Sequence, residues 1–502
     1  MLKPKQIDEL PEVLIELYSQ VEMDIIADMA RRISGMDYYI PAAQWQYRKL
    51  IEMGNCHGWI VQVLSAQTGK SRKEIERMME EAGIKAIKQD AAIYKRAGLS
   101  PPELAASPTL QAVINDGIRN TEGLFENLTG TTANTATKQF ERALDRAWLQ
   151  LQSGAFSQEE AIHGAVKDLA EKGIESIAYP SGRVDHMDVA VRRAAVTGAN
   201  QSALRLQEAL ADELSCDLVE TTAHAGARPE HTVWQGKVFS RSGTHPRYPD
   251  FRSSTGYGMG SGLGGWNCRH SFFPFFEGVS DPAYTQSELD EMNAQKYTYN
   301  GENLTEYEAA QKQRAIERNI RRWKREYKAM EAAGLDTSEA AAKLSRWQEK
   351  QKDFLTQTGL KRQTERERVE GFGRREAARA AGESRAFVKR LHMRYNDGIV
   401  IDDAQLGKKI RRHAADYGLS PGGTDDRERL ADIIRDIVAN RDTIVRGEWR
   451  GQGKILPDGR REDGPVDFII KGEDVVVAKE GAFVTILKGG ITNARVKRAW
   501  KG

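Results

Sequence analysis

Potential metal ligands gather in the middle of the chain. The segment from residue 221 to 276 holds four of the nine histidines, a run of glycine and serine, and an aromatic end. Four of its side chains are chemically capable of ligating zinc, namely His224, His231, Cys268 and His270, and Cys-x-His is a usable ligand pair. The His-x6-His spacing matches no standard zinc pattern, however. We therefore expect a hydrogen-bonded structural cluster in a loop-rich module, with no metal or other cofactor.

A second group of reactive side chains lies near the C-terminus. His413 is the only histidine after residue 400, and it falls on an apolar stripe with Lys409 one turn earlier and Arg412 beside it. A lone histidine on such a stripe is commonly a hydrogen-bonded core residue. The side chains that accompany it on the following predicted strands favour a functional site instead: Trp449, Arg450, Lys471, Thr485 and Lys488.

The composition indicates a protein with several domains. With 502 residues, the chain has room for about three or four domains. Hydrophobic residues make up 40% and charged residues 29%, with a formal net charge of +2, so any binding of polyanions must be local. Residues 405–502 hold 20 Lys and Arg against 15 Asp and Glu, which places a basic excess at this end.

Cysteine usage and apolar patterning argue against disulfide-rich, exported and membrane-spanning proteins. The three cysteines are spread over three regions, which argues against a disulfide framework and fits a reducing compartment. The N-terminal residues lack an apolar run followed by a small-residue cleavage site, and about 18 uncharged apolar residues never run together. We therefore expect neither a signal peptide nor a membrane span.

Helical periodicity dominates the first 214 residues. The pattern predicts separate helices over residues 44–66 and 71–94, with residues 68–71 as the cap between them, and further helices over 108–128 and 137–177. Another long helix is expected over 184–214. Six glycines between residues 253 and 265 predict a flexible loop within the mid-chain module.

The segment from residue 285 to 399 is typical of long, charged helices. Apolar residues spaced four and three apart form a seam of about two heptads: Ile316, Ile320, Trp323, Tyr327 and Met330. Basic side chains decorate the rest of this helix: Arg314, Arg318, Arg321, Arg322, Lys324 and Arg325. We expect them to form a solvated face, and the alternative is contact with packaged DNA or with an acidic partner.

Beyond residue 400 the pattern predicts a small α+β domain. Two amphipathic helices precede strands over residues 443–452, 466–471, 475–479 and 483–488, and a helix pair on an antiparallel sheet is the economical arrangement. The expected fold class is therefore mostly α in the N-terminal and middle regions, with a loop-rich α+β module in mid-chain and a small α+β domain at the end.

The mid-chain motif carries a family resemblance. It resembles the head-morphogenesis module of tailed bacteriophages in two stretches, Thr-Thr-Ala-His224-x-Gly-x-Arg228-Pro-x-His231-x-x-Trp-x-Gly236 and Gly-Trp-Asn267-Cys268-Arg269-His270-x-x-x-Pro274. More narrowly, it is similar to the phage minor capsid protein 2 family, which is related to Mu-type head-morphogenesis proteins. The likeness covers residues 5 to 390. It implies a structural protein of the virion that associates with portal and capsid proteins, in the capsid interior or at the portal vertex.

Residues 400–502 resemble the nuclease superfamily that includes barnase, EndoU, colicin D and RelE, in the phage-borne versions found behind head-morphogenesis modules. The likeness rests on helices followed by a four-stranded sheet, on a helix-borne histidine, and on Thr485 in the last strand. It implies a toxin-like effector domain that cleaves host RNA without a metal.

Metal-independent RNA cleavage needs a base for the ribose 2′-hydroxyl proton, cations for the charge that grows on the phosphate, and a group that orients it. His413 would act as the base or acid, and Thr485 would hold a non-bridging oxygen. The phosphate charge would be stabilised by Lys409, Arg412 or Arg450. Trp449 would stack on a base, and two further cations would contact the nucleic acid, Lys471 and Lys488.

Both Thr485 and the C-terminal domain have alternative roles. Strict alternation places Thr485 on the strand face of Phe483 and Leu487, and if that face is buried, Thr485 is a core residue. The alternative to an effector domain is a non-catalytic virion protein whose basic regions bind packaged DNA.

We expect four regions. They are a helical capsid- or portal-associated region over residues 1–214, a head-morphogenesis module over 215–284, a charged helical region over 285–399 and a nuclease-like domain over 400–502. The predicted function is that of a minor capsid, head-morphogenesis protein of a tailed phage or prophage, with a C-terminal ribonuclease effector.

Overall fold

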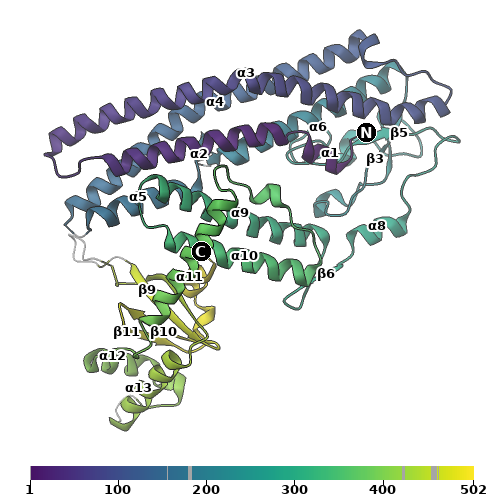
Figure 1. The fold of residues 1–502 in the computed structure, drawn as a ribbon. Coiled ribbons are helices and arrows are strands. Elements are labelled where there is room, and N and C mark those ends of the chain that lie inside the picture. Colours follow the sequence, from purple (N-terminus) through teal and green to yellow (C-terminus); the bar gives the residue numbers. More distant parts are fainter. Residues whose placement is uncertain are drawn as a thin grey trace.

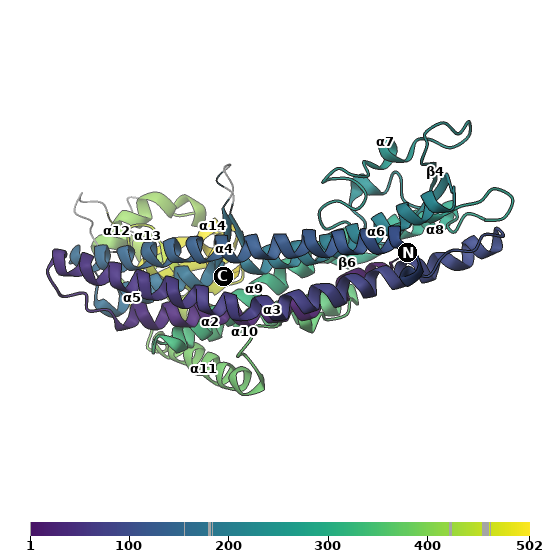
Figure 2. The ribbon, with the colours of Figure 1, turned by 90° about the horizontal axis from the view of Figure 1, so that it is seen from above.

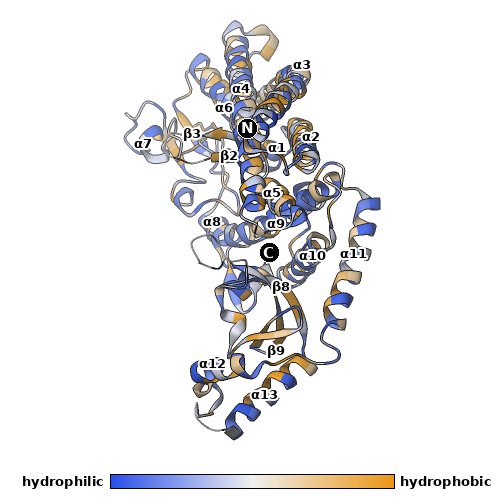
Figure 3. Cartoon of the chain, turned by 90° about the vertical axis from the view of Figure 1, so that its left-hand side faces the viewer, coloured by the Kyte–Doolittle hydropathy of each residue, from blue (hydrophilic) through white to orange (hydrophobic). Residues whose placement is uncertain are grey.

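The computed structural model describes residues 2–154, 156–178, 182, 184–420, 424–453, 461 and 463–501. Its elements are mostly α-helices with small antiparallel sheets, which confirms the predicted fold class (Figure 1). The molecule forms three tiers, in which long N-terminal helices, shorter middle helices and the C-terminal sheet follow one another (Figure 3). No helix among the described residues combines the length and the apolar character that a bilayer span requires.

Long helices that run side by side build the N-terminal tier (Figure 2). Its helices are α1 (Pro4–Glu9), α2 (Glu12–Gly35), α3 (Ala42–Arg96), α4 (Pro108–Gln152), α5 (Gln158–Lys172) and α6 (Met187–Glu213). Two short antiparallel strands lie between the last two helices, β1 (Glu175–Ala178) and β2 (Val184–His186). With 55 residues, α3 is about 80 Å long.

The helices of this tier continue where the sequence predicts interruptions. α3 is unbroken across residues 68–71, so the predicted cap is wrong. Ser71 is buried within the helix and donates its hydroxyl to Gln67 O (2.9 Å) or Tyr18 Oη (3.3 Å). α4 also spans the predicted gap between residues 128 and 137, where the hydroxyl of the buried Thr132 donates to Leu128 O (2.6 Å). Tertiary packing therefore overrides the local signals in both helices.

A loop-rich module follows α6 and lies at one end of the long helices (Figures 1 and 2). Its antiparallel sheet has the order β4-β3-β5, formed by β4 (Val238–Ser240), β3 (Leu218–Thr221) and β5 (Phe272–Pro274). The short helix α7 (Phe251–Thr255) packs beside this sheet through Phe251, which contacts the ring of Phe272 at a centroid distance of 5.0 Å.

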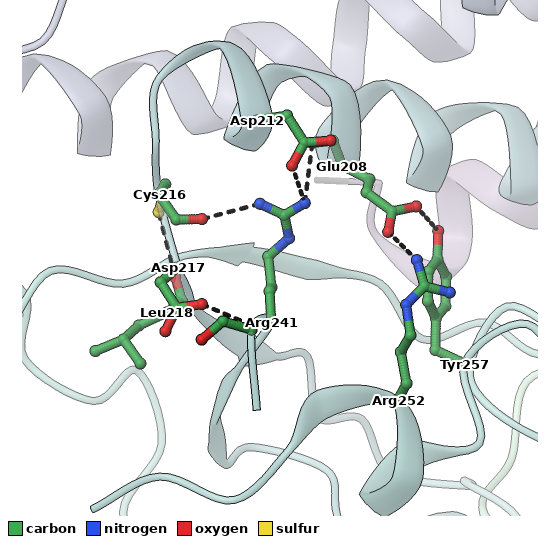
Figure 4. Close-up of polar contacts among 9 residues, drawn as sticks. Glu208, Asp212, Cys216, Asp217, Leu218, Arg241, Arg252 and Tyr257 are labelled. Atoms are coloured by element: carbon green, nitrogen blue, oxygen red, sulfur yellow. Dashed lines mark hydrogen bonds and ion pairs between the residues drawn. The ribbon is translucent and has the colours of Figure 1, made fainter. Parts of the chain in front are cut away.

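Two arginines attach the module to α6 (Figure 4). Arg241 donates to Cys216 O (2.9 Å) and forms an ion pair with Asp212. Arg252 forms an ion pair with Glu208. The module is therefore fastened to the helical tier by charged contacts as well as by its aromatic core.

The glycine-rich loop of the module is closely packed, where the sequence predicts flexibility. A Cβ atom on Gly262 would lie 2.1 Å from Gly256 O, because two backbone stretches touch at this point. Leu263 is fully buried between them and the sheet. The glycines therefore permit a close backbone approach.

The middle tier contains the charged helices. Its elements are α8 (Gln286–Asn293), β6 (Tyr297–Tyr299), β7 (Glu302–Leu304), α9 (Glu306–Ala332), α10 (Ser338–Thr358) and α11 (Arg374–Met393). The predicted seam of α9 is confirmed, since all five of its apolar residues are buried, namely Ile316, Ile320, Trp323, Tyr327 and Met330.

Much of the basic side of α9 faces other helices, so the predicted solvated face is largely wrong. Arg325 is 8% exposed and donates to Ala170 O and Glu171 O on α5. Arg321 forms an ion pair with Asp188 at 3.1 Å, and Arg322 pairs with Glu171 at 3.1 Å. These cations join α9 to the N-terminal tier.

The C-terminal domain contains a helix pair on a four-stranded antiparallel sheet, as predicted, and a further helix that was not predicted covers the other face. Its order is β11-β10-β9-β8, with β8 (Thr443–Trp449), β9 (Gly464–Lys471), β10 (Asp474–Lys479) and β11 (Ala482–Leu487). One face packs against α12 (Asp403–His413) and α13 (Thr424–Ala439), and the other against α14 (Ala494–Lys501). In sequence and in space this domain lies far from the mid-chain module (Figure 1).

Candidate functional site

Three of the four candidate ligands meet in the mid-chain module. Cys268 Sγ lies 3.5 Å from His270 Nδ1 and 3.9 Å from His231 Nδ1. The three donor atoms all lie within 4.8 Å of one another, and all three side chains are buried. The ring of the fourth candidate, His224, lies 4.3 Å from the ring of His270.

Different segments bring these side chains together. His231 ends a short 3₁₀ turn, η2 (Pro229–His231), whereas Cys268 and His270 lie in the segment that enters β5. Asn200 of α6 holds that segment, because its side-chain amide donates to Cys268 O (3.0 Å) and lies 3.4 Å from His270 O. The buried α6 amide therefore fixes the backbone on both sides of Arg269.

The outer ring nitrogens of the two central histidines have oxygen acceptors. His231 Nε2 donates to Ser261 O (2.9 Å), and His270 Nε2 donates to Gln235 Oε1 (3.1 Å). Gln235 Oε1 also accepts the backbone N–H of His224 (3.3 Å), which supports this orientation of the amide. Each Nδ1 therefore carries a lone pair on the side that faces Cys268.

The imidazoles of this cluster are neutral. Burial, reinforced by the neighbouring His224 and His231, lowers the pKa of His270 to about 2. Burial also lowers the pKa of His231 and that of His224. Neutral imidazoles offer one lone pair each, which is the form that binds a metal ion.

The cluster lies on the wall of a cleft of about 980 Å³. Arginines from several parts of the chain line this cleft, among them Arg192, Arg269, Arg314, Arg318, Arg321 and Arg366. Asp8 of α1 lies among them and accepts two hydrogen bonds from Arg269, at 2.7 and 2.9 Å. Burial alone would raise the pKa of Asp8, but Arg269, Arg192 and Arg366 outweigh it and hold the pKa below its usual range.

In the C-terminal domain, the structure brings His413 and Thr485 together. His413 ends α12, and its Nε2 lies 3.4 Å from Thr485 Oγ1 on β11. Its Nδ1 lies 3.2 Å from Asp416 Oδ2. The imidazole is thus held between a carboxylate and a hydroxyl, with its side chain 20% exposed.

Thr485 is 3% exposed, so its side chain is buried as the core alternative predicts, and an irregularity in the sheet alters the predicted strand alternation. The register between β10 and β11 shifts where Val477 pairs with Thr485 and Ala478 pairs with Phe483. As a result, Phe483 packs on the face that contacts α12, whereas Leu487 packs on the opposite face. Strict alternation predicts that Phe483 and Leu487 share a face, and the register shift places them on opposite faces instead.

Three predicted cations lie on the elements that carry this pair. Lys409 and Arg412 are on α12, and Lys488 follows β11. Burial, with Arg412 beside it, lowers the pKa of Lys409. Lys488 Nζ lies 2.9 Å from Asp474 Oδ2 and 5.1 Å from the ring centre of Tyr417.

The remaining predicted residues lie elsewhere on the sheet. Trp449 and Arg450 are at the end of β8, which is the opposite edge strand from β11, about 14 Å away at ordinary strand spacing. Trp449 packs against Phe468 on the α14 face, and Lys471 pairs with Asp436 of α13 at 2.5 Å. The structure does not bring these three residues to His413.

Comparison with known proteins decides the class of the chain. The family model described as "Phage minor capsid protein 2" matches residues 2–356. The chain belongs to this family. It is therefore a structural protein of the phage virion, which assembles with other capsid proteins.

Two relatives agree with the family of this minor capsid protein. A structural protein of Lactococcus phage LL-H is 23% identical over 305 residues, which cover 58% of this chain and 78% of the relative. A structural protein of Lactococcus phage mv4 is 32% identical over 128 residues, which cover 25% of this chain and 94% of the relative. No solved structure matches.

The family match covers one of the two candidate sites of the minor capsid protein and ends before the other. Residues 2–356 include the histidine cluster and most of the arginine-lined cleft, whereas His413 and Thr485 lie beyond the match. Asp416 was not among the predicted site residues, although an acid three residues after a helix-borne histidine was a usable signal. Gln235 and Ser261 gave no such signal, because only the fold places them beside the cluster.

Proposed function

We propose that this minor capsid protein carries a metal-independent ribonuclease site in its C-terminal domain. The observation that carries the proposal is the placement of His413 between Asp416 and Thr485, at 3.2 and 3.4 Å. Asp416 accepts the Nδ1 proton, which leaves Nε2 as the proton acceptor of the site. The host RNA expected from the nuclease resemblance is the proposed substrate.

In the proposed reaction, His413 Nε2 takes the proton of a ribose 2′-hydroxyl. The 2′-oxygen then forms a bond to phosphorus, the bond from phosphorus to the 5′-oxygen of the next nucleotide breaks, and that oxygen takes a proton from solvent. The hydroxyl of Thr485 donates to a non-bridging phosphate oxygen. Lys409, Arg412 and Lys488 stabilise the negative charge that develops there.

The test is RNA cleavage by the full-length protein and its variants. We expect His413→Ala to lower the rate by about 10²- to 10⁴-fold, since a general base contributes that much. Thr485→Val keeps a buried side chain of similar size and removes only the hydroxyl. His392→Ala on α11 is the matched control, because His392 has no role in the proposed reaction. Full activity in His413→Ala, or no cleavage by the unmodified protein, contradicts the proposal.

We further propose that the N-terminal helices attach the protein to the portal vertex or the inner capsid surface. Leu50 and Ile51 follow Tyr47 by three and four residues on α3, and Tyr47, Leu50 and Ile51 are 68%, 63% and 45% exposed. Adjacent exposed apolar residues are typical of an interaction surface. We expect Leu50→Asp to lower the amount of this chain in purified virions, whereas Ile84→Asp, at a 53% exposed position further along α3, leaves it unchanged.

Packaged DNA is the alternative partner of the basic regions. The ion pairs of Arg321 and Arg322 with acids leave those two guanidinium groups less available to phosphates. DNA binding by this region would weaken steeply as salt concentration rises. Binding of duplex DNA with such a salt dependence, together with absence of RNA cleavage, would favour the alternative.

A further inference from the structure

The histidine cluster of the mid-chain module contains more acceptors than donors. Cys268 has one thiol proton, but the Nδ1 lone pairs of His231 and His270 both face its sulfur. The backbone N–H of His270 also donates to that sulfur, at 3.4 Å. One imidazole lone pair therefore lacks a donor in this buried site, which is a costly arrangement for a neutral cluster.

His224 adds another acceptor without a donor. Its Nδ1 donates to Ala225 O (2.9 Å), so the lone pair is on Nε2. Nε2 is buried and has no hydrogen-bond partner among the described residues. The residue lines the same cleft as the other three side chains.

The spacing of the donor atoms fits a tetrahedral zinc ion. Zinc lies about 2.3 Å from a thiolate sulfur and about 2.0 Å from an imidazole nitrogen, which separates sulfur from nitrogen by about 3.5 Å at a tetrahedral angle. The two sulfur–nitrogen distances in this cluster are 3.5 and 3.9 Å. His231, Cys268 and His270 form the group of donor atoms within 4.8 Å of one another, whereas His224 lies beside that group with its ring 4.3 Å from the ring of His270, so its side chain has to turn toward the ion.

The groups around the cluster also fit a metal site. Histidines that ligate a metal commonly donate their other ring nitrogen to an oxygen acceptor, which fixes the tautomer and the orientation of the ring. Ser261 O, Gln235 Oε1 and Ala225 O accept these hydrogen bonds here. All three imidazoles are thus set with their free lone pairs on the remaining nitrogens.

We propose that His231 Nδ1, Cys268 Sγ and His270 Nδ1 bind one zinc ion, with His224 Nε2 as the fourth ligand. Binding releases the thiol proton of Cys268, and the resulting thiolate balances part of the zinc charge. Four protein ligands leave no open coordination position, so the ion is structural. It ties the segment after β3 and the η2 turn to the segment that enters β5.

The first test needs no substitution. Full-length protein is purified, loaded with zinc and washed, and its metal content is measured by inductively coupled plasma mass spectrometry. We expect one zinc per chain. Replacement of zinc by cobalt(II) should give thiolate-to-cobalt charge-transfer absorption and the intense visible bands of a tetrahedral site. Protein that retains no zinc and gives no such absorption overturns the proposal.

Variants locate the ion. Cys268→Ser is expected to abolish the charge-transfer absorption, whereas Cys216→Ser, at another buried cysteine of the same module, leaves it unchanged. Gln235→Leu should weaken zinc binding about 10- to 100-fold, because it removes only the acceptor that orients His270. His224→Ala should weaken binding at least as much. A cobalt spectrum that persists in Cys268→Ser overturns the assignment.

Discussion

Asp467 links the C-terminal sheet to the helix that precedes it. Asp467 lies on β9 and is 1% exposed. Its Oδ2 accepts hydrogen bonds from Tyr395 Oη (2.7 Å) and Arg394 Nη1 (2.8 Å), and its Oδ1 accepts one from Arg446 Nη1 (3.3 Å). Replacing Asp467 by Asn keeps the shape but removes the charge and one acceptor.

The cost follows from these contacts. Removing one partner of a buried ion pair costs about 3–5 kcal/mol. The arginine side chains are 37% and 26% exposed, so water partly replaces the lost carboxylate. We therefore expect Asp467→Asn to destabilise this region by about 2–3 kcal/mol. Tyr395→Phe removes one hydrogen bond to a charged group and should cost about 1.5 kcal/mol.

Hydrogen exchange measures this effect locally. We expect the amides of β9 to exchange roughly 30- to 150-fold faster in Asp467→Asn, since each 1.4 kcal/mol is tenfold. Asp432→Asn is the control, because Asp432 is 66% exposed and pairs with Arg435 of its own helix. Unchanged protection of β9 in Asp467→Asn would refute the reasoning that this contact fastens the sheet to the segment after α11.

Two further predictions concern the loop and the helical tiers. Gly262→Ala places a methyl group against Gly256 O and should lower the melting temperature, at a cost of about 1–3 kcal/mol in the free energy of unfolding. The control is Gly58→Ala, because no atom lies within 4 Å of a Cβ at that position. Gly278 is also open, but its φ of +74° makes it unsuitable as a control. Burial raises the pKa of Glu326 to about 7, so stability should fall as pH rises from about 4.5 to 7. Glu326→Gln should remove up to about 3 kcal/mol of that fall, as measured by urea unfolding at pH 5 and pH 7.5, and an unchanged pH dependence would contradict this assignment.

Helix patterns in the sequence predict the parts of the fold that depend on local periodicity. The seam of α9 was predictable because Ile316, Trp323 and Tyr327 repeat at helical spacing, and each one is buried. The continuity of α3 was not predictable, because residues 68–71 resemble a cap, and the contact of the buried Ser71 with Tyr18 of a distant helix cannot be read from the local sequence. The inward direction of the α9 arginines likewise depends on acids from distant segments.

The two candidate sites were predictable to different degrees. His413 and Thr485 were identified from a resemblance, and the structure places them 3.4 Å apart. The register shift beside Thr485 leaves no mark in the sequence, so strict alternation could not describe this strand. The sequence spacing of His231 and Cys268 also hides their proximity. The closely packed glycine loop lies between them in sequence, and its fold brings the two side chains together.

The chemical nature of the RNA ends tests the central proposal most directly. Purified full-length protein is incubated with a short RNA in the presence of EDTA, and the products are identified by mass spectrometry. Attack by the 2′-hydroxyl predicts fragments that end in a 2′,3′-cyclic phosphate, formed by the unmodified protein and by His392→Ala but not by His413→Ala. Fragments with a 3′-hydroxyl, or intact RNA in every sample, would contradict the proposed site.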